Sequence, residues 1–337
     1  MAKIRFWLNA LAIASALAGA QVVMGGQEKV QPILPPPVTP RVVVPEIPYT
    51  LVMVGDIVSR SSLDRAEQVG RSVAWIIERT PNSMAVLQGD ICNDESLGDE
   101  CYDWFARSSW GQLLRDGKLI TVPGNHDYLV NSARTYFRLF PNSPGKTGLG
   151  YQGIDHGPHW RIEALNSELP EGPERQEQIR WLRSEMREHH QSKCLIAAMH
   201  RPPYSSGRFA SPRARLLTSG EFFPLGGDIV SASHDHLFDS IQWVRPGDDP
   251  KDDLVIKLDK SKGMHVFVVG TGGSDPYHGL ALGKPRYGDA HNEVVITQQS
   301  GVLRLTLWKG RYDWEFVQPN GSVGAQGTGV CHDNPTN

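Results

Sequence analysis

The stretch "KLITVPGNHD" (Lys118–Asp127) runs from an apolar segment directly into a cluster of polar side chains. Its first part, "KLITVPG", reads as a buried strand, because apolar residues follow one another and a Pro-Gly pair ends the run. Asn125, His126 and Asp127 come next. By itself, "PGNHD" is also typical of a Pro-Gly turn with an Asx cap. Its meaning therefore depends on the rest of the chain.

Four other apolar segments end in the same way. They place Asp56 after "YTLVMVG", Asp90 after "MAVLQG", His200 at the end of "CLIAAMH", and His234 and His236 at the end of "DIVSASHDH". In open α/β sheets, ligands bind outside the carboxyl ends of the strands, and core packing does not require polar residues there. Each segment alone has an ordinary explanation, such as a turn or a surface histidine. All five in this order favour one shared site.

The apolar runs alternate with helical patterns before the last third of the chain. Apolar residues recur at helical spacing at positions 66, 69, 73, 76 and 77, and again at positions 179, 182 and 186. The last third instead contains short strand-like runs, namely "MHVFVVG", "EVVIT", "VLRLTLW" and "YDWEFV". We therefore predict an α/β (α+β) fold in which βαβ units come first and an antiparallel sheet follows.

The N-terminal segment has the pattern of an export signal. Two basic residues precede an apolar run that ends in Ala18-Gly19-Ala20, a small-x-small cleavage pattern. The run is short for a bilayer span, which needs ~20 apolar residues, although an uncleaved anchor is the alternative. We expect a signal peptide over residues 1–20, a Pro-rich extended spacer over 21–48, and one catalytic domain over 49–337. The mature protein would then be secreted or periplasmic, with no membrane span after cleavage.

The overall charge does not favour nucleic acid as a partner. The formal net charge is −3 and the pI is about 6.5. Nucleic-acid binding proteins usually carry a basic face, so no nucleic acid is indicated as a partner.

The stretch "LQGDICNDESLGDEC" (Leu87–Cys101) combines an acid cluster with two of the four cysteines. Asp90 ends the strand, whereas the later acids, Glu95 among them, are expected in a solvated loop. Export places cysteines in an oxidising compartment, and Cys92 and Cys101 can pair within this loop. Cys194 lies in an apolar run and is expected to be a buried small hydrophobe. Full pairing of the four has three solutions, and the sequence does not choose among them.

Carboxylate, amide and imidazole side chains at the strand ends are ligands that suit Fe, Mn or Zn without any thiolate. A carboxylate can bridge two such cations, and two cations ~3.5–4 Å apart can clamp the attacking and leaving oxygens of a phosphoryl displacement. A metal-bound hydroxide would then be the nucleophile. A nearby histidine can protonate the leaving oxygen. Such a set of side chains can therefore support metal-assisted phosphoryl displacement.

The order Gly-Asp, Gly-Asp, Gly-Asn-His-Asp, His, His-x-His resembles the calcineurin-like metallophosphoesterase superfamily. "VPGNHDY", "ALNSE", "HRPPYSSG", "SASHDHLF" and "FVVGTGG" are similar to the secreted bacterial branch related to purple acid phosphatases. The resemblance extends from about Tyr49 to the C-terminus. It implies a two-sheet β-sandwich flanked by helices, with the metal site at the C-terminal ends of the strands.

The resemblance also implies roles for individual residues. Asp90 would bridge two metal ions of unknown identity. The second metal would be bound by Asp90, Asn125, His200 and His234, and the first by Asp56, Asp90 and His236. His126 would be the acid that faces the leaving group, and Asp127 would orient it.

The chain departs from the family pattern at the first metal. Relatives add either a His two residues after the first Asp, which is Val58 here, or a Tyr three residues after the bridging Asp, which is Asn93 here. Asn93 remains a possible metal ligand through its amide oxygen, and water can complete such a site. Ser233 stands where a Gly usually precedes His-Asp-His.

These observations favour an exported phosphomonoesterase that acts on a small-molecule phosphate ester. A phosphodiesterase or nucleotidase of the same fold is one alternative. Because the first metal lacks a ligand, a metal- or phosphate-binding domain with little catalysis is another. Arg201, Tyr204 and His278 are candidate substrate contacts from motif-flanking loops. A Ser-His-Asp hydrolase is excluded because no G-x-S-x-G elbow exists.

Overall fold

The computed structural model describes residues 46–141, 148–190, 192–246, 256–276 and 292–332. The predicted signal peptide and almost all of the spacer lie outside these residues. The first strand begins at Tyr49, the position at which the sequence predicts the start of the folded domain.

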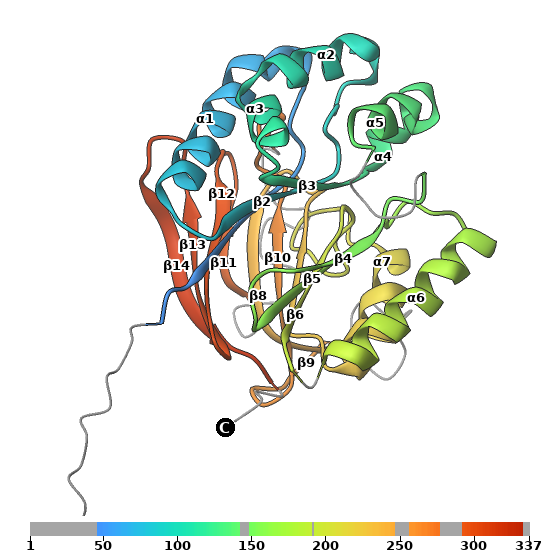
Figure 1. The fold of residues 1–337 in the computed structure, drawn as a ribbon, viewed down its shortest axis with the longest axis vertical. Coiled ribbons are helices and arrows are strands. Elements are labelled where there is room, and N and C mark those ends of the chain that lie inside the picture. The colour runs from blue at the N-terminus through green and yellow to red at the C-terminus, as the bar shows by residue number, and fades with distance from the viewer. Residues whose placement is uncertain (1–45, 142–147, 191, 247–255, 277–291, 333–337) are drawn as a thin grey trace, which may run out of the picture. The chain divides into compact units, whose positions relative to one another are not determined.

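Two β-sheets form the centre of the fold (Figure 1). The six-stranded sheet has the order β14-β13-β12-β1-β2-β3, with β1 Tyr49–Val54, β2 Ser83–Gln88, β3 Leu119–Val122, β12 Val302–Trp308, β13 Arg311–Val317 and β14 Val323–Val330. The eight-stranded sheet has the order β11-β8-β10-β7-β6-β5-β4, with β9 paired to β8; its strands are β4 Gln152–Asp155, β5 Trp160–Ala164, β6 Cys194–Ala198, β7 Ile229–Ala232, β8 Phe238–Pro246, β9 Ile256–Leu258, β10 Met264–Val269 and β11 Asn292–Ile296.

Parallel pairing dominates where the sequence predicts βαβ units. Strands β1, β2 and β3 run parallel, and so do β5, β6, β7 and β10. The prediction of one C-terminal antiparallel sheet is wrong in its arrangement, because the late strands divide between the two sheets. Strands β12–β14 extend the first sheet antiparallel to β1, whereas β8 and β11 join the second. Local strand patterns do not encode the partner strand, so the sequence could not show this division.

Helices flank both sheets. They are α1 Leu63–Arg79, α2 Asp99–Arg107, α3 Ser109–Arg115, α4 Asn125–Leu129, α5 Arg134–Leu139, α6 Pro173–His189 and α7 Pro212–Leu217. Figure 1 shows α1 and α3 beside β2 and β3, and α6 and α7 beside the second sheet. The buried residues of α1 include all five apolar positions predicted from helical spacing. The structure thus confirms the predicted two-sheet sandwich flanked by helices.

The main core lies between the two sheets and under helices α1, α2 and α3. Leu51 and Met53 from the first sheet belong to the same buried cluster as Ile162 and Phe267 from the second. A smaller cluster joins the second sheet to α6 and α7, where Leu182 packs with no exposed surface. Burying a Leu side chain contributes about 1.5–3 kcal/mol. These contacts hold the strand ends in a fixed relation.

The structure pairs Cys92 with Cys101 and Cys194 with Cys331. The interpretation of Cys194 as a simple buried hydrophobe is therefore wrong, although its side chain is indeed buried. Cys194 begins β6, and Cys331 follows β14. The second disulfide thus joins the two sheets.

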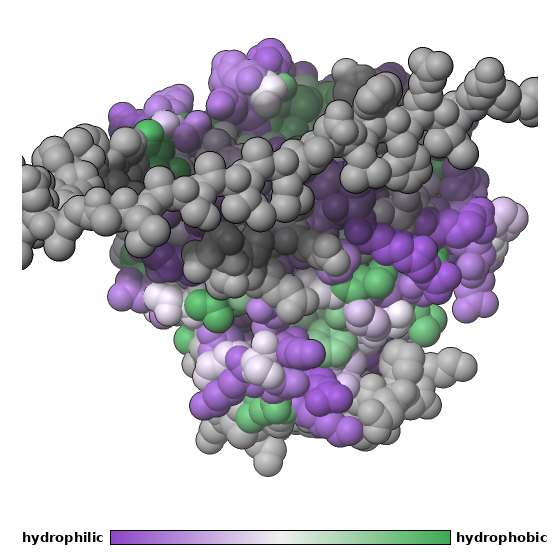
Figure 2. Space-filling model, turned by 60° about the horizontal axis from the view of Figure 1, so that its bottom comes forward, coloured by the Kyte–Doolittle hydropathy of each residue, from purple (hydrophilic) through white to green (hydrophobic). Residues whose placement is uncertain are grey.

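Hydrophilic side chains cover most of the described surface on the face seen in Figure 2. The large hydrophobic side chains that are exposed come from separate segments, among them Trp75, Leu129 and Phe209. Within the ranges that the structure describes, no helix is long and apolar enough to cross a bilayer.

Candidate metal centre

The predicted ligands follow five strand ends that meet at one edge of the sandwich. Asp56 comes after β1 and Asp90 after β2, and both adopt positive φ angles of 61° and 49°. His234, after β7, has φ 70°. Non-glycine residues with positive φ carry backbone strain of about 1–3 kcal/mol and cluster at functional sites. Three of the six predicted metal ligands share this strained geometry.

Two glycines allow the loops to approach closely. A Cβ at Gly124 would lie 2.1 Å from Asp90 Oδ1, and one at Gly55 would lie 2.4 Å from Ser233 Oγ. Both positions therefore exclude any side chain. This lack of space explains why Gly precedes both Asp56 and Asn125.

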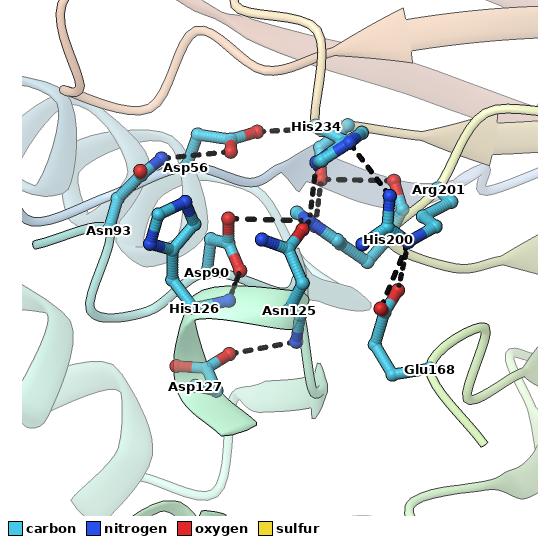
Figure 3. A network of polar contacts seen from close by, with 12 residues as sticks. Asp56, Asp90, Asn93, Asn125, His126, Asp127, Glu168, His200, Arg201 and His234 are labelled. Carbon is cyan, nitrogen blue, oxygen red and sulfur yellow. Dashed lines mark hydrogen bonds and ion pairs between the residues drawn. The ribbon is translucent and has the colours of Figure 1, made fainter. Parts of the chain in front are cut away.

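His200 is the centre of the predicted second-metal group (Figure 3). Its Nε2 lies 3.0 Å from Asn125 Oδ1, 3.1 Å from His234 Nδ1 and 3.3 Å from Asp90 Oδ2. Asp90, His200 and His234 offer ligand atoms that all lie within 4.8 Å of one another. The four residues assigned to this metal from the sequence thus converge on one point, and their donor atoms are those that Fe, Mn or Zn accept.

Neighbouring groups fix the orientation of the His200 ring. Its Nδ1 lies 2.9 Å from the carbonyl oxygen of Gln88 and 3.0 Å from Ser233 Oγ. With Nδ1 bonded in this way, Nε2 is the nitrogen that faces a metal, an arrangement common at metal-binding histidines. The hydroxyl of Ser233 also donates to the Gln88 carbonyl. The sequence marked Ser233 only as a departure, and its link to His200 is visible only in three dimensions.

The predicted first-metal group has fewer protein ligands than the second. His236 Nε2 lies 3.3 Å from Asp56 Oδ1, and the amide nitrogen of Asn93 lies 3.0 Å from both of these atoms. His236 Nδ1 donates to the Asp275 carbonyl at 2.7 Å, so Nε2 faces the site. Rotating the Asn93 amide by half a turn would present its oxygen at the same point. The structure thus brings Asn93 to the position of the missing ligand.

Val58 cannot supply that ligand. It is fully buried in the main core, and its carbonyl accepts the Asn93 backbone N–H at 2.7 Å. An isolated parallel bridge pairs it with Cys92. Val58 therefore holds the Asn93 loop in place by backbone contacts.

Charges at the site are arranged to receive cations. Burial alone would lower the pKa of His200, but the Asp90 carboxylate raises it to about 10. Burial raises the pKa of Asp56, but His236 and other imidazoles lower it to about 2. Each carboxylate therefore stabilises positive charge on the neighbouring imidazole, and the same negative charge would attract a metal ion. The residues present fit a two-metal centre.

His126 is held by a residue that the sequence did not identify. Its Nδ1 donates to the Glu95 carboxylate at 2.8 Å, while its backbone N–H donates to Asp90 Oδ1 at 2.8 Å. Nε2 is then the nitrogen available to a substrate. Glu95 begins the short 3-10 helix η2 (Glu95–Leu97) within the acid cluster. Glu95 is solvated as expected, since its side chain is 52% exposed, but it also holds the His126 ring, which the sequence did not indicate.

Asp127 does not orient the His126 ring, which corrects the role implied by the resemblance. Its carboxylate is fully buried and accepts the backbone N–H groups of Gly124, Ile91 and Cys92 and the Tyr102 hydroxyl. Burial and the nearby Asp90 raise the pKa of Asp127, while these donors oppose the rise. Asp127 instead ties α4 to the loop after β2.

The three candidate substrate contacts have different outcomes. Arg201 lies at the site, because its Nη1 is 3.0 Å from His234 Nε2 and its Nε is 2.9 Å from both oxygens of Glu168. Tyr204 does not support the prediction, since its side chain packs in the smaller core cluster and its hydroxyl lies 2.9 Å from Ser219 Oγ. His278 lies outside the described residues.

Phe209 adds an apolar surface that the sequence did not point to. Its ring centroid lies 5.3 Å from that of His234, and the residue is 44% exposed. The Asp235 carboxylate between the two late histidines accepts the backbone N–H groups of Arg208 and Phe209. Asp235 thus positions the loop that carries Phe209.

Comparisons with known proteins identify the family and the fold. The family model described as calcineurin-like phosphoesterase matches residues 49–238. No curated protein matches the chain. Solved structures with a similar fold include a purple acid phosphatase from yellow lupin (Lupinus luteus), at 17% identity and a TM-score of 0.66. That match covers 84% of this chain and 54% of the lupin chain. This chain therefore spans about half of the lupin enzyme.

Two further structures show the same fold. A dimetal phosphatase from Danio rerio has 13% identity and a TM-score of 0.53, over 85% of this chain and 100% of that one. GAP50, described as the anchor in the inner membrane complex of Plasmodium, has 15% identity and a TM-score of 0.57, over 85% of this chain and 90% of that one. Because the family model matches more than half of the sequence, the chain belongs to the calcineurin-like phosphoesterase family.

Proposed function

We propose that this protein is an exported hydrolase of phosphate monoesters that works with two metal ions. The observation that carries the proposal is the convergence of Asp90, Asn125 and His234 on the Nε2 atom of His200. His126 and Arg201, which serve no core-packing purpose, border the same point. A purely structural cluster would need neither of them.

The resident metals would be held by Asp56, Asp90 and His236 with Asn93, and by Asp90, Asn125, His200 and His234. When bound, the two ions polarise the phosphoryl group and supply a water nucleophile at neutral pH. We assign Asp90 to both groups, because its Oδ2 lies 3.3 Å from His200 Nε2 and its negative charge also acts on His236. Its two oxygens already face different neighbours, His200 on one side and the His126 backbone N–H on the other.

The chain's own residues account for the other steps. The His126 side chain is 30% exposed and therefore reachable from solvent. It can donate a proton from Nε2 to the leaving oxygen while Glu95 holds Nδ1. The Arg201 guanidinium lies beside His234 and can bind a non-bridging phosphate oxygen, a contact for which its planar donor group is suited. A terminal phosphate offers more such oxygens than a diester, which supports the monoester assignment.

Export is proposed on two grounds. The first is the charged and apolar N-terminal pattern. The second is that the structure pairs all four cysteines as disulfides, and such bonds persist in oxidising compartments. Secretion with signal cleavage near Gln21 predicts a mature N-terminus that mass spectrometry of the exported protein would identify.

A substrate panel tests the proposed reaction. The purified protein is reconstituted separately with Fe, Mn and Zn, and its metal content is measured beside the hydrolysis of p-nitrophenyl phosphate and bis(p-nitrophenyl) phosphate. We expect about two metal ions per chain and a kcat/KM for the monoester at least tenfold above that for the diester. A preference for the diester would instead establish the phosphodiesterase alternative. One tightly bound metal without hydrolysis would establish a binding domain.

A further inference from the structure

A cleft adjoins the metal centre at Arg201. It has a volume of about 670 Å³, and its lining includes Arg175, Arg201, Arg213 and Glu171. Arg201 belongs to both places, since it lines the cleft while its Nη1 lies 3.0 Å from His234 Nε2. A volume of this size is ordinary for a small-molecule site and far exceeds that of a single phosphate group. The cleft can therefore receive the part of a substrate that extends beyond the reacting phosphate.

Arg175 is the unusual member of this lining. It is 4% exposed, yet no carboxylate of the described residues lies within ion-pair distance of it. Its guanidinium instead donates a hydrogen bond from Nη2 to the backbone carbonyl of Arg213, at 3.1 Å. A buried charge without an opposite partner costs several kcal/mol. Burial, followed by repulsion from Arg213, lowers the pKa of Arg175, while the Glu171 carboxylate acts in the opposite direction without reversing the shift.

The rest of the lining offsets only part of that charge. Arg213 is exposed and, within the described ranges, has no ion-pair partner. Three guanidinium groups therefore face two carboxylates, Glu171 in the lining and Glu168, which is bound to Arg201. Ser211 also lines the cleft, but its hydroxyl accepts the Ala214 backbone N–H at the start of α7. Because Glu168 pairs with Arg201, Arg175 and Arg213 together exceed Glu171 by one positive charge.

We propose that this cleft is a specificity pocket for a second anionic group, so that the preferred substrates are phosphate monoesters carrying another phosphate on the same small molecule. The reacting phosphate lies at the metal centre, and the second anionic group binds between Arg175 and Arg213. Arg201 lies between the two positions. This inference rests on the proposed phosphomonoesterase function and names its substrate class.

The experiment compares fructose 1,6-bisphosphate with fructose 6-phosphate on the metal-reconstituted protein. Both kcat/KM and the dissociation constant, the latter by isothermal titration calorimetry, are measured for the wild type and for Arg213→Glu and Arg175→Met. Arg213→Glu reverses an exposed charge, so loss of folding is not expected to obscure its effect. The matched control is Arg187→Glu, an exposed arginine on α6 that lies about 18 Å along the helix from Arg175.

We expect the wild type to prefer the bisphosphate by about tenfold or more, since charge-assisted hydrogen bonds are the strong ones. In Arg213→Glu and Arg175→Met this ratio should fall about tenfold, whereas Arg187→Glu should leave it unchanged. An unchanged ratio in both pocket variants, or no preference in the wild type, would overturn the inference. Tighter bisphosphate binding without any hydrolysis would overturn the proposed function and leave the pocket established. Hydrolysis of both sugar phosphates without a preference would support the proposed function and overturn the specificity pocket.

Discussion

At the scale of single residues, the position of Asn93 matters most. Its amide lies 3.0 Å from both Asp56 and His236, at the position for which the family resemblance implies a tyrosine. The backbone places it there, because the Asn93 N–H donates to the Val58 carbonyl at 2.7 Å. An amide oxygen is a weaker ligand than a carboxylate for these cations. The first metal should therefore be the more weakly bound of the two.

Substitutions at Asn93 test this assignment. In Asn93→Ala we expect the content of tightly bound metal to fall from two ions per chain towards one, while Asn93→Asp should retain both because it adds a charged ligand. Inductively coupled plasma mass spectrometry after dialysis measures the content directly. Two metals retained in Asn93→Ala would show that Asn93 is not a ligand.

The contact between His126 and Glu95 is the second feature that single substitutions can test. In Glu95→Gln the amide can still contact Nδ1, but it no longer stabilises a protonated ring. We expect kcat for alkyl phosphates, whose leaving groups need a proton, to fall about tenfold, with a smaller loss for p-nitrophenyl phosphate. Steady-state kinetics with a series of leaving groups measures this difference. Glu100→Gln, from the same acid cluster, serves as the control.

An equal loss of kcat across all leaving groups would contradict a positioning role for Glu95. It would indicate a general disturbance of the loop after β2 instead. A larger KM with unchanged kcat would point to substrate binding.

At the scale of elements, the network between β5 and α6 illustrates a polar cluster with no catalytic role. The Glu163 carboxylate has no exposed surface and accepts Arg161 Nε at 2.8 Å. Arg161 also pairs with Asp155 and with Glu185 of α6. Burial raises the pKa of Glu163 from 4.5 to about 7, although Arg161 opposes the rise. The native state therefore retains a proton that the unfolded chain releases.

The sign of the resulting pH dependence follows from linkage. Between about pH 4.5 and pH 7 the native state binds more protons at Glu163, so this residue makes stability fall as pH rises through that window. Glu163→Gln should remove the effect. Relative to the wild type, its free energy of unfolding should improve by about 2 kcal/mol between pH 5 and pH 8. Urea denaturation at both pH values measures the difference, with Glu188→Gln as an exposed control; a difference that does not change with pH would refute it.

The elements also show what the sequence could and could not reveal. The strand ends at Asp56, Asp90 and His200 were predictable, because apolar runs and polar endings are local features. The contact between Glu95 and His126 joins residues that lie far apart in the chain. No sequence spacing predicts such a contact. The same holds for Arg175, which a helical pattern presents as an ordinary charged position. Burial of a charged side chain without a carboxylate in ion-pair contact is a property of the tertiary fold alone.

At the scale of the whole molecule, the Cys194–Cys331 disulfide joins the two sheets across a sequence separation of 137 residues. Closing so long a loop reduces the entropy of the unfolded chain, an effect worth up to about 4–5 kcal/mol. Cys194 begins β6, whereas His200 follows the other end of that strand. Removing this disulfide should therefore lower stability without lowering the metal content.

We expect the double variant Cys194→Ala/Cys331→Ala to lose about 2–4 kcal/mol of unfolding free energy while retaining its metal content. The contrasting variant is Cys92→Ala/Cys101→Ala, whose disulfide closes a separation of only 9 residues. It should lose less stability but more metal, because Asn93 follows Cys92 directly. Chemical denaturation beside metal analysis distinguishes the two. Loss of metal in the first variant would refute the separation.

The central claim is that Asp90 joins two metal ions in one hydrolytic centre, and the variant Asp90→Asn tests it most directly. Metal content and p-nitrophenyl phosphate turnover are measured together on the wild type and the variant after identical reconstitution. The account predicts two metals and hydrolysis in the wild type, and in Asp90→Asn a fall in kcat of at least about a hundredfold together with loss of bound metal. Unchanged turnover in Asp90→Asn would contradict it.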